Sequence, residues 1–72
     1  MDTATAGNKL MEMAARIREM REIIGYTVVQ MAELIGVTVE EYEKVEAGKV
    51  DPTFNFLHQC AIAFGVDINA LL

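Results

Sequence analysis

Hydrophobic residues recur along this chain at spacings of three and four, and glycines separate the stripes that they form. Apolar residues at such spacings share one face of an α-helix. Gly25 follows the first stripe and can adopt the left-handed conformation that ends many helices. The pattern predicts a helix from roughly Asn8 to Ile24, after a flexible tail formed by residues 1–8. The stripe consists of Leu10, Met13, Ala14, Ile17, Met20 and Ile24.

Two shorter helices are predicted in residues 27–47 from their start and stop signals. A threonine followed three residues later by Gln or Glu is a capping box, and this pattern begins at Thr27 and again at Thr38. Gly36 and Gly48 then stop the two helices. The residues of the first short helix expected to point inward are Met31, Ala32 and Ile35.

The rest of the chain predicts two more helices. Either Asp51 or Thr53 is suited to cap the fourth helix, which ends at Gly65. Asp67 is expected to cap a last turn or two through Leu72. No sustained alternation and no hairpin dipeptide indicates a strand, so the expected fold is all-α with five helices. The inward stripe of the fourth helix is Phe54, Leu57, Ala61 and Phe64.

The composition indicates one small domain with an unusual surface. A chain of 72 residues buries only about 60% of its unfolded surface, and the single Cys60 cannot form an internal disulfide. Hydrophobic residues make up 53% of the chain, above the usual ~45–50%. Some of them must therefore lie on the surface, either as scattered side chains or as a partner-binding patch.

The charge and the apolar runs limit the compartment and the partners. The net charge is −5, whereas an isolated nucleic-acid-binding module is usually basic. No apolar run approaches the roughly 20 residues that cross a bilayer. A lone cysteine fits a reducing compartment. We therefore expect a cytoplasmic protein with no membrane partner.

No pattern in the sequence indicates catalysis. His58 and Cys60 are two positions apart, on different sides of a helix, with no third ligand at metal spacing. There is no phosphate-binding glycine loop, nucleophile elbow or metal-binding HExxH. We predict no enzyme activity, no metal and no cofactor, with His58 on the surface and Cys60 in the core.

Two short helices joined only by Gly36-Val37-Thr38 have the spacing of a helix-turn-helix, although any αα-corner could show the same spacing. From Arg16 to Leu72 the chain resembles the phage-repressor (lambda-repressor-like, XRE-type) helix-turn-helix family. The resemblance implies a five-helix lambda-repressor-like bundle over residues 9–72, with the motif at residues 27–47. It also implies a sequence-specific DNA-binding domain of a bacterial transcriptional regulator, acting as a homodimer on a two-fold-related site in double-stranded DNA. The matching positions are Arg21, Ala32, Gly36-Val37-Thr38, Glu46-x-Gly48-Lys49, Pro52 and Phe64-Gly65-Val66-Asp67.

The same resemblance implies roles for individual residues. Arg21 and Glu46 stand where the family has a buried ion pair. Val28 stands where members often carry a glutamine that can pair with adenine, and Glu40 could accept a hydrogen bond from a cytosine amino group. Phosphate contacts would come from the amides at the start of the second helix, helped by lysines. The implied DNA-binding residues are Thr27, Val28, Thr38, Val39, Glu40, Lys44 and Lys49.

The acidity of the third helix leaves two interpretations open. Glu40 and Glu41 can stabilise the positive end of the helix dipole by about 0.3–1 kcal/mol each. Alternatively, the domain has lost most of its DNA affinity and is a protein–protein interaction or oligomerisation module. Five apolar residues stand where the family is usually polar, and they are either semi-buried side chains or a partner surface: Ile23, Ile24, Leu34, Phe56 and Ile62.

The pattern looks most like helix-turn-helix domains joined to a C-terminal cupin-like sensor barrel. This chain stops at Leu72, where such a second domain would begin. A C-terminal sensor domain in a longer parent chain is therefore a further candidate partner for the apolar residues.

Overall fold

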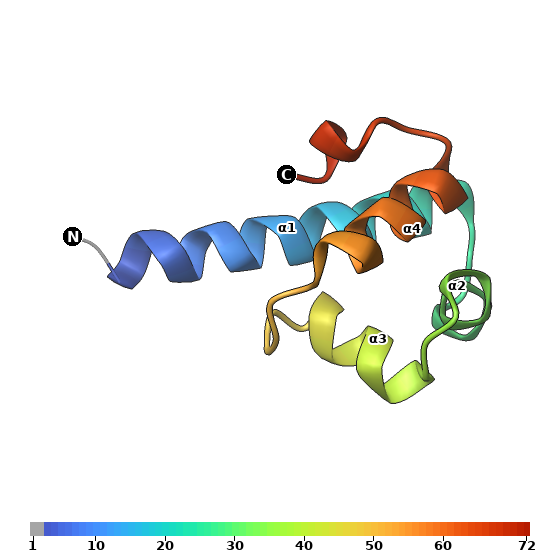
Figure 1. Ribbon diagram of the computed structural model, residues 1–72, viewed down its shortest axis with the longest axis horizontal. Helices are drawn as coiled ribbons and strands as arrows, with labels where there is room; N and C mark the ends of the chain where they lie inside the picture. The colour runs from blue at the N-terminus through green and yellow to red at the C-terminus, as the bar shows by residue number, and fades with distance from the viewer. Residues whose placement is uncertain (1–2) are drawn as a thin grey trace.

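The computed structural model describes the backbone of residues 3–72 and the side chains of residues 9–72. This part of the chain is all-helical, as predicted, and contains no strand. The first helix, α1, runs along the length of the molecule, and α3 and α4 pack against it, while α2 packs on α3 and α4 and the last turn packs on α4 (Figure 1). The elements are α1 (Thr3–Ile24), α2 (Val28–Ile35), α3 (Val39–Glu46), α4 (Phe54–Phe64) and the 3₁₀ turn η1 (Ile68–Ala70).

The two ends of the fold differ from the expectation. The fifth helix is a single 3₁₀ turn of three residues, although Asp67 does cap it by accepting from the Asn69 amide at 2.8 Å. α1 begins at Thr3 rather than Asn8, so it includes most of the segment predicted as a tail. Met1 and Asp2 lie outside the described residues.

Both short helices begin with the predicted capping boxes. The Thr27 hydroxyl accepts from the Gln30 amide at 3.0 Å, and the Gln30 side chain accepts in return from the Thr27 amide at 2.8 Å. Thr38 and Glu41 make the same reciprocal pair at the start of α3, both at 3.0 Å. Gly36 ends α2 with φ of 77°, a left-handed conformation that a residue without Cβ adopts at low cost. A threonine therefore caps the start of each helix, and Gly36 and Thr38 fix the two ends of the turn that sets α2 against α3.

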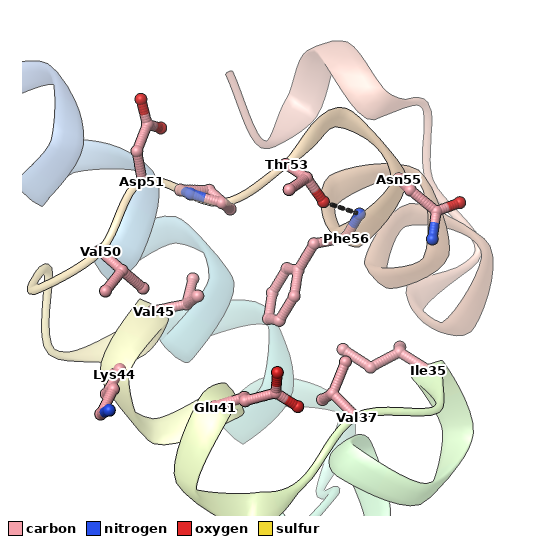
Figure 2. A pocket seen from close by; sticks show the side chains of 11 residues that line it. Ile35, Val37, Glu41, Lys44, Val45, Val50, Asp51, Thr53, Asn55 and Phe56 are labelled. Carbon is pink, nitrogen blue, oxygen red and sulfur yellow. Dashed lines mark hydrogen bonds between the residues drawn. The ribbon is translucent and has the colours of Figure 1, made fainter.

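The choice between two caps for α4 is resolved in favour of Thr53. Its hydroxyl accepts from the Phe56 amide at 3.1 Å (Figure 2). α4 then runs to Phe64 and ends at Gly65, whose φ is 72°. α4 contacts α1, α2 and η1, so it forms the centre of the packing.

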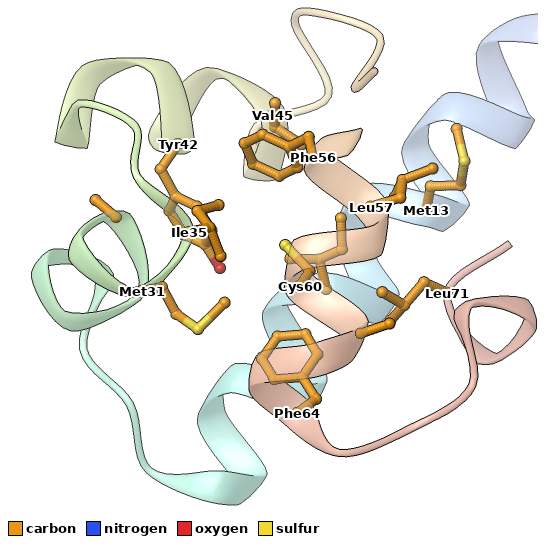
Figure 3. Close-up of a cluster of buried hydrophobic side chains, with 13 residues drawn as sticks. Met13, Met31, Ile35, Tyr42, Val45, Phe56, Leu57, Cys60, Phe64 and Leu71 are labelled. Atoms are coloured by element: carbon orange, nitrogen blue, oxygen red, sulfur yellow. The ribbon is translucent and has the colours of Figure 1, made fainter. Parts of the chain in front are cut away.

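The core lies between α4 and the other helices (Figure 3). Phe56 lies in it with 8% exposure, so its assignment to a partner surface is wrong. Phe54 was predicted to point inward, but it is 71% exposed, so that prediction is also wrong. Its ring stacks on that of His58, with centroids 6.0 Å apart. The core consists of Met13, Ile17, Met31, Ala32, Ile35, Tyr42, Val45, Phe56, Leu57, Cys60, Ala61, Phe64 and Leu71.

Candidate nucleic-acid interface

The starts of α2 and α3 and the outward side of α3 form the candidate interface. On α3, Tyr42 and Val45 are buried, and the helical repeat places Glu40, Glu43 and Lys44 on the opposite, exposed side. The first turn of any helix leaves backbone N–H groups without intrahelical partners, and these favour anions. The interface thus combines two positive helix ends with one helix side open to solvent.

The residues implied by the family resemblance do not all have the same access to solvent. Val28 is half-buried and packs against the core, which leaves only part of its side chain for a base contact. Lys49 lies beyond the far end of α3, about 12 Å along the helix axis from the first turn. The exposed members of the set are Thr27, Thr38, Val39, Glu40, Lys44 and Lys49.

The electrostatics of this surface oppose a polyanion. Residues 27–53 carry six acidic and two basic side chains. Glu40 and Glu43 form no ion pair with any described residue. Glu43 was not among the predicted interface residues, although its position three residues after Glu40 signals the same helix side. Close contact of either carboxylate with a phosphate would cost about 1 kcal/mol even in water.

Glu46 takes no part in this surface because it pairs with Arg21. Its carboxylate accepts from Nε and from an Nη of Arg21 at 2.7 and 3.2 Å, a two-point contact between α3 and α1. The side chains are 9% and 13% exposed. A hydrogen bond to Glu46 is the largest cause that raises the pKa of Arg21. The ion pair implied by the family resemblance is therefore present, and it orients α3.

Tyr42 and Cys60 lie in the core beside this ion pair. Burial, and then the nearby Glu46 carboxylate, raises the pKa of the Tyr42 phenol. The Tyr42 hydroxyl makes no hydrogen bond of regular geometry with the described residues. Burial also raises the pKa of the Cys60 thiol to about 12. Both groups are thus held neutral and are unsuited to nucleophilic chemistry at ordinary pH.

The other predicted partner-surface residues are exposed. Ile23 and Ile24 lie at the end of α1, Leu34 lies on α2 and Ile62 lies on α4. Among the described side chains, no group of three or more His, Cys, Asp or Glu residues could hold a metal ion. None of the helices among residues 3–72 combines the length and apolarity that a membrane crossing requires.

Two short helices with this turn, packed inside a small helical bundle, define a helix-turn-helix domain. A helix-turn-helix family profile matches residues 17–71. The chain belongs to that family, and its fold is of the phage-repressor type. Members of the family are transcriptional regulators.

Two curated relatives match most of the chain. The cryptic phage CTXphi transcriptional repressor RstR of Vibrio cholerae is 34% identical over 61 residues, which are 85% of this chain and 54% of that protein. The SPbeta prophage-derived uncharacterized HTH-type transcriptional regulator YonR of Bacillus subtilis is 33% identical over 57 residues, or 79% of this chain and 53% of that protein. The chain therefore spans about half the length of these relatives.

Two crystal structures share the fold. The restriction-modification controller protein C.AhdI of Aeromonas hydrophila has a TM-score of 0.85 at 23% identity, covering 90% of this chain and 98% of that one. The clp gene regulator ClgR of Corynebacterium glutamicum has a TM-score of 0.83 at 21% identity, covering 88% of this chain and 67% of that one. At these identities the likeness concerns the fold alone.

Proposed function

We propose that this domain binds double-stranded DNA in a sequence-specific manner through α2 and α3. The observation that carries the proposal is the exposed side of α3, held outward by a buried side and by the Arg21–Glu46 pair. An α-helix presented in this way fits the major groove, where side chains read base edges. The domain would thereby serve a bacterial transcriptional regulator.

Different residues in and beside α2 and α3 would contact the phosphates and the bases. The amides at the start of α2, together with the Thr27 hydroxyl, would contact phosphates, helped by Lys44 and Lys49. Val39 can meet a thymine methyl group, and Glu40 can accept from a cytosine amino group. Glu40 would thus favour a site with cytosine at the contacted position, while its negative charge repels the DNA phosphates. This repulsion weakens binding to non-specific DNA.

We further propose that the DNA-bound form is a homodimer. One domain offers few phosphate contacts, and a second copy on a two-fold-related half-site about 34 Å away doubles them. The exposed apolar side chains Ile23, Leu34 and Ile62 are available for contacts between copies or with a C-terminal sensor domain in a longer parent chain. Family membership supports a cytoplasmic regulator without enzyme activity.

Binding selection on random duplex DNA at low salt tests the proposal. The expected result is an enriched motif with two-fold symmetry. A parallel selection with Lys44→Glu, which reverses one exposed charge on α3, should lose the enrichment. If the unmodified domain enriches no motif, the proposal of sequence-specific DNA binding is wrong, and the domain serves as an interaction module instead.

A further inference from the structure

A hollow of about 370 Å³ opens between α3 and the segment that leads into α4 (Figure 2). Sites for small organic molecules begin at volumes of about 300 Å³ and are lined mostly by apolar groups with a few polar ones. The hollow meets both conditions at the small end of that range. Its apolar lining is Ile35, Val37, Val45, Val50, Pro52 and Phe56.

Glu41 supplies the charged group that faces into this hollow. Figure 2 shows its carboxylate directed toward the ring of Phe56, while the side chains of Lys44 and Asp51 point away from the middle. Oε1 of Glu41 already accepts from the Thr38 amide and hydroxyl, at 3.0 and 3.2 Å. Oε2 makes no hydrogen bond with a described residue, so it is available to a ligand.

We propose that the hollow binds a small amphipathic amine, with one ammonium group on a compact apolar body. The ammonium donates to Oε2 of Glu41, a charge-assisted hydrogen bond. The apolar body lies against Phe56 and Val45. A carboxylate ligand would instead meet the like charge of Glu41. Since the titratable groups of the lining are Glu41, Asp51 and Lys44, their sum also favours a cation.

The position of the hollow connects it with the proposed DNA surface. Lys44 lines the hollow and also stands on the exposed side of α3. A bound ammonium would add positive charge there and strengthen phosphate binding. This consequence rests on the proposed function, whereas amine binding does not. Amine binding is therefore measured without DNA, so that a failure of amine binding can be distinguished from a failure of the proposed DNA binding.

The test is an NMR titration of the domain with 2-phenylethylamine, and with 2-phenylethanol as the uncharged analogue. A ligand of this size should bind with a Kd on the order of 1 mM. The variant Glu41→Gln removes the charge but can retain the capping box, because Gln30 fills the equivalent position of α2 in this chain. The matched control is Glu40→Gln, whose residue does not line the hollow.

The unmodified domain and Glu40→Gln should bind the amine equally, with shifted amide signals at Val37, Val45 and Phe56. Glu41→Gln should bind it about tenfold more weakly, since a hydrogen bond between charged groups is lost. The alcohol should bind the unmodified domain as weakly as the amine binds Glu41→Gln. The assignment is wrong if Glu41→Gln and Glu40→Gln bind the amine with equal affinity. It is also wrong if the unmodified domain binds the amine no more tightly than the alcohol, or does not bind the amine at all.

Discussion

The guanidinium of Arg21 donates to three acceptors at once, two oxygens of Glu46 and the carbonyl oxygen of Tyr26. These bonds join α1, α3 and the turn before α2. Because both charged side chains are largely buried, removing one leaves the other charge without a partner in a poorly solvated place. Arg21 therefore adds a hydrogen-bonded link between α1 and the helix-turn-helix to their shared hydrophobic core.

Arg21→Ala should lower the free energy of unfolding by about 3–5 kcal/mol, the usual cost of breaking a buried ion pair. Urea denaturation followed by circular dichroism measures this change. Arg18→Ala is the matched control, because it removes an exposed arginine from the same helix and should change the stability by less than about 0.5 kcal/mol. Similar losses in both variants would mean that the pair contributes little to stability.

The buried thiol of Cys60 predicts a loss of stability at alkaline pH. In the unfolded chain the thiol ionises near its ordinary pKa of about 8.5, whereas in the folded domain its pKa is about 12. Between these values the unfolded state binds fewer protons, so the free energy of unfolding falls as pH rises. The slope reaches up to ~1.4 kcal/mol per pH unit.

Denaturant titrations of the parent domain and of Cys60→Ala at several pH values from 8 to 10 check this. The variant lacks the titrating thiol, so its free energy of unfolding should fall less steeply above pH 8.5. Tyr42 contributes only nearer its ordinary pKa of about 10, and equally in both proteins. Parallel curves would contradict a buried, neutral thiol.

At the scale of helices, the two phenylalanines at the start of α4 show where the sequence pattern becomes ambiguous. At 100° per residue, Phe54 and Phe56 both lie about 80° from the centre of the buried stripe, on opposite sides. Periodicity cannot choose between two such flanks. The neighbouring helix does, because the ring of Phe56 stacks on that of buried Tyr42, with centroids 5.9 Å apart.

Phe56→Ala should therefore destabilise the domain by about 3–5 kcal/mol, the usual cost of removing a buried phenyl ring. Phe54→Ala should cost less than about 1 kcal/mol, since that ring is mostly in water. Thermal unfolding of both variants measures the difference. Equal losses, or a larger loss for Phe54→Ala, would show that the helix is rotated relative to this description.

Helix boundaries were predictable wherever a cap or a left-handed glycine fixes them. Thr27, Thr38, Gly36 and Gly65 all do so. The start of α1 was missed because its apolar stripe begins only at Leu10, and the preceding small residues carry no periodic signal. The last helix was overestimated because the residues after Asp67 form only one 3₁₀ turn, Ile68–Ala70, and Leu71 already caps its end.

The site was predictable to a smaller extent than the fold. The spacing of the two short helices indicated a helix-turn-helix or another αα-corner, and the family resemblance chose between them and also supplied the role of Glu46. Half-burial of Val28 depends on how α2 packs, which no local pattern reports. The hollow beside Glu41 forms only when α3 and the segment before α4 are brought together, so it had no sequence signal.

For the molecule as a whole, the acidity of the helix-turn-helix limits how strongly salt can affect DNA binding. Lys44 and Lys49 are the only basic side chains in residues 27–53. Each neutralised phosphate contributes about −0.9 to the slope of log affinity against log salt concentration. Two or three contacts per protomer predict a slope of about −2 to −3, and about twice that for a dimer. Fluorescence anisotropy at several salt concentrations measures it, and a much steeper slope would reveal cationic contacts from elsewhere on the domain.

The central claim is that the exposed side of α3 faces DNA, and the affinity of Glu40→Gln for random duplex DNA tests it most directly. The substitution removes one negative charge with little change of size. Glu19→Gln is the control, because it makes the same change in net charge on the exposed side of α1. Isothermal titration at low salt should show about fivefold tighter binding for Glu40→Gln, corresponding to ~1 kcal/mol of relieved repulsion, and little change for Glu19→Gln. Equal affinities of the two variants and the parent would mean that α3 does not face DNA.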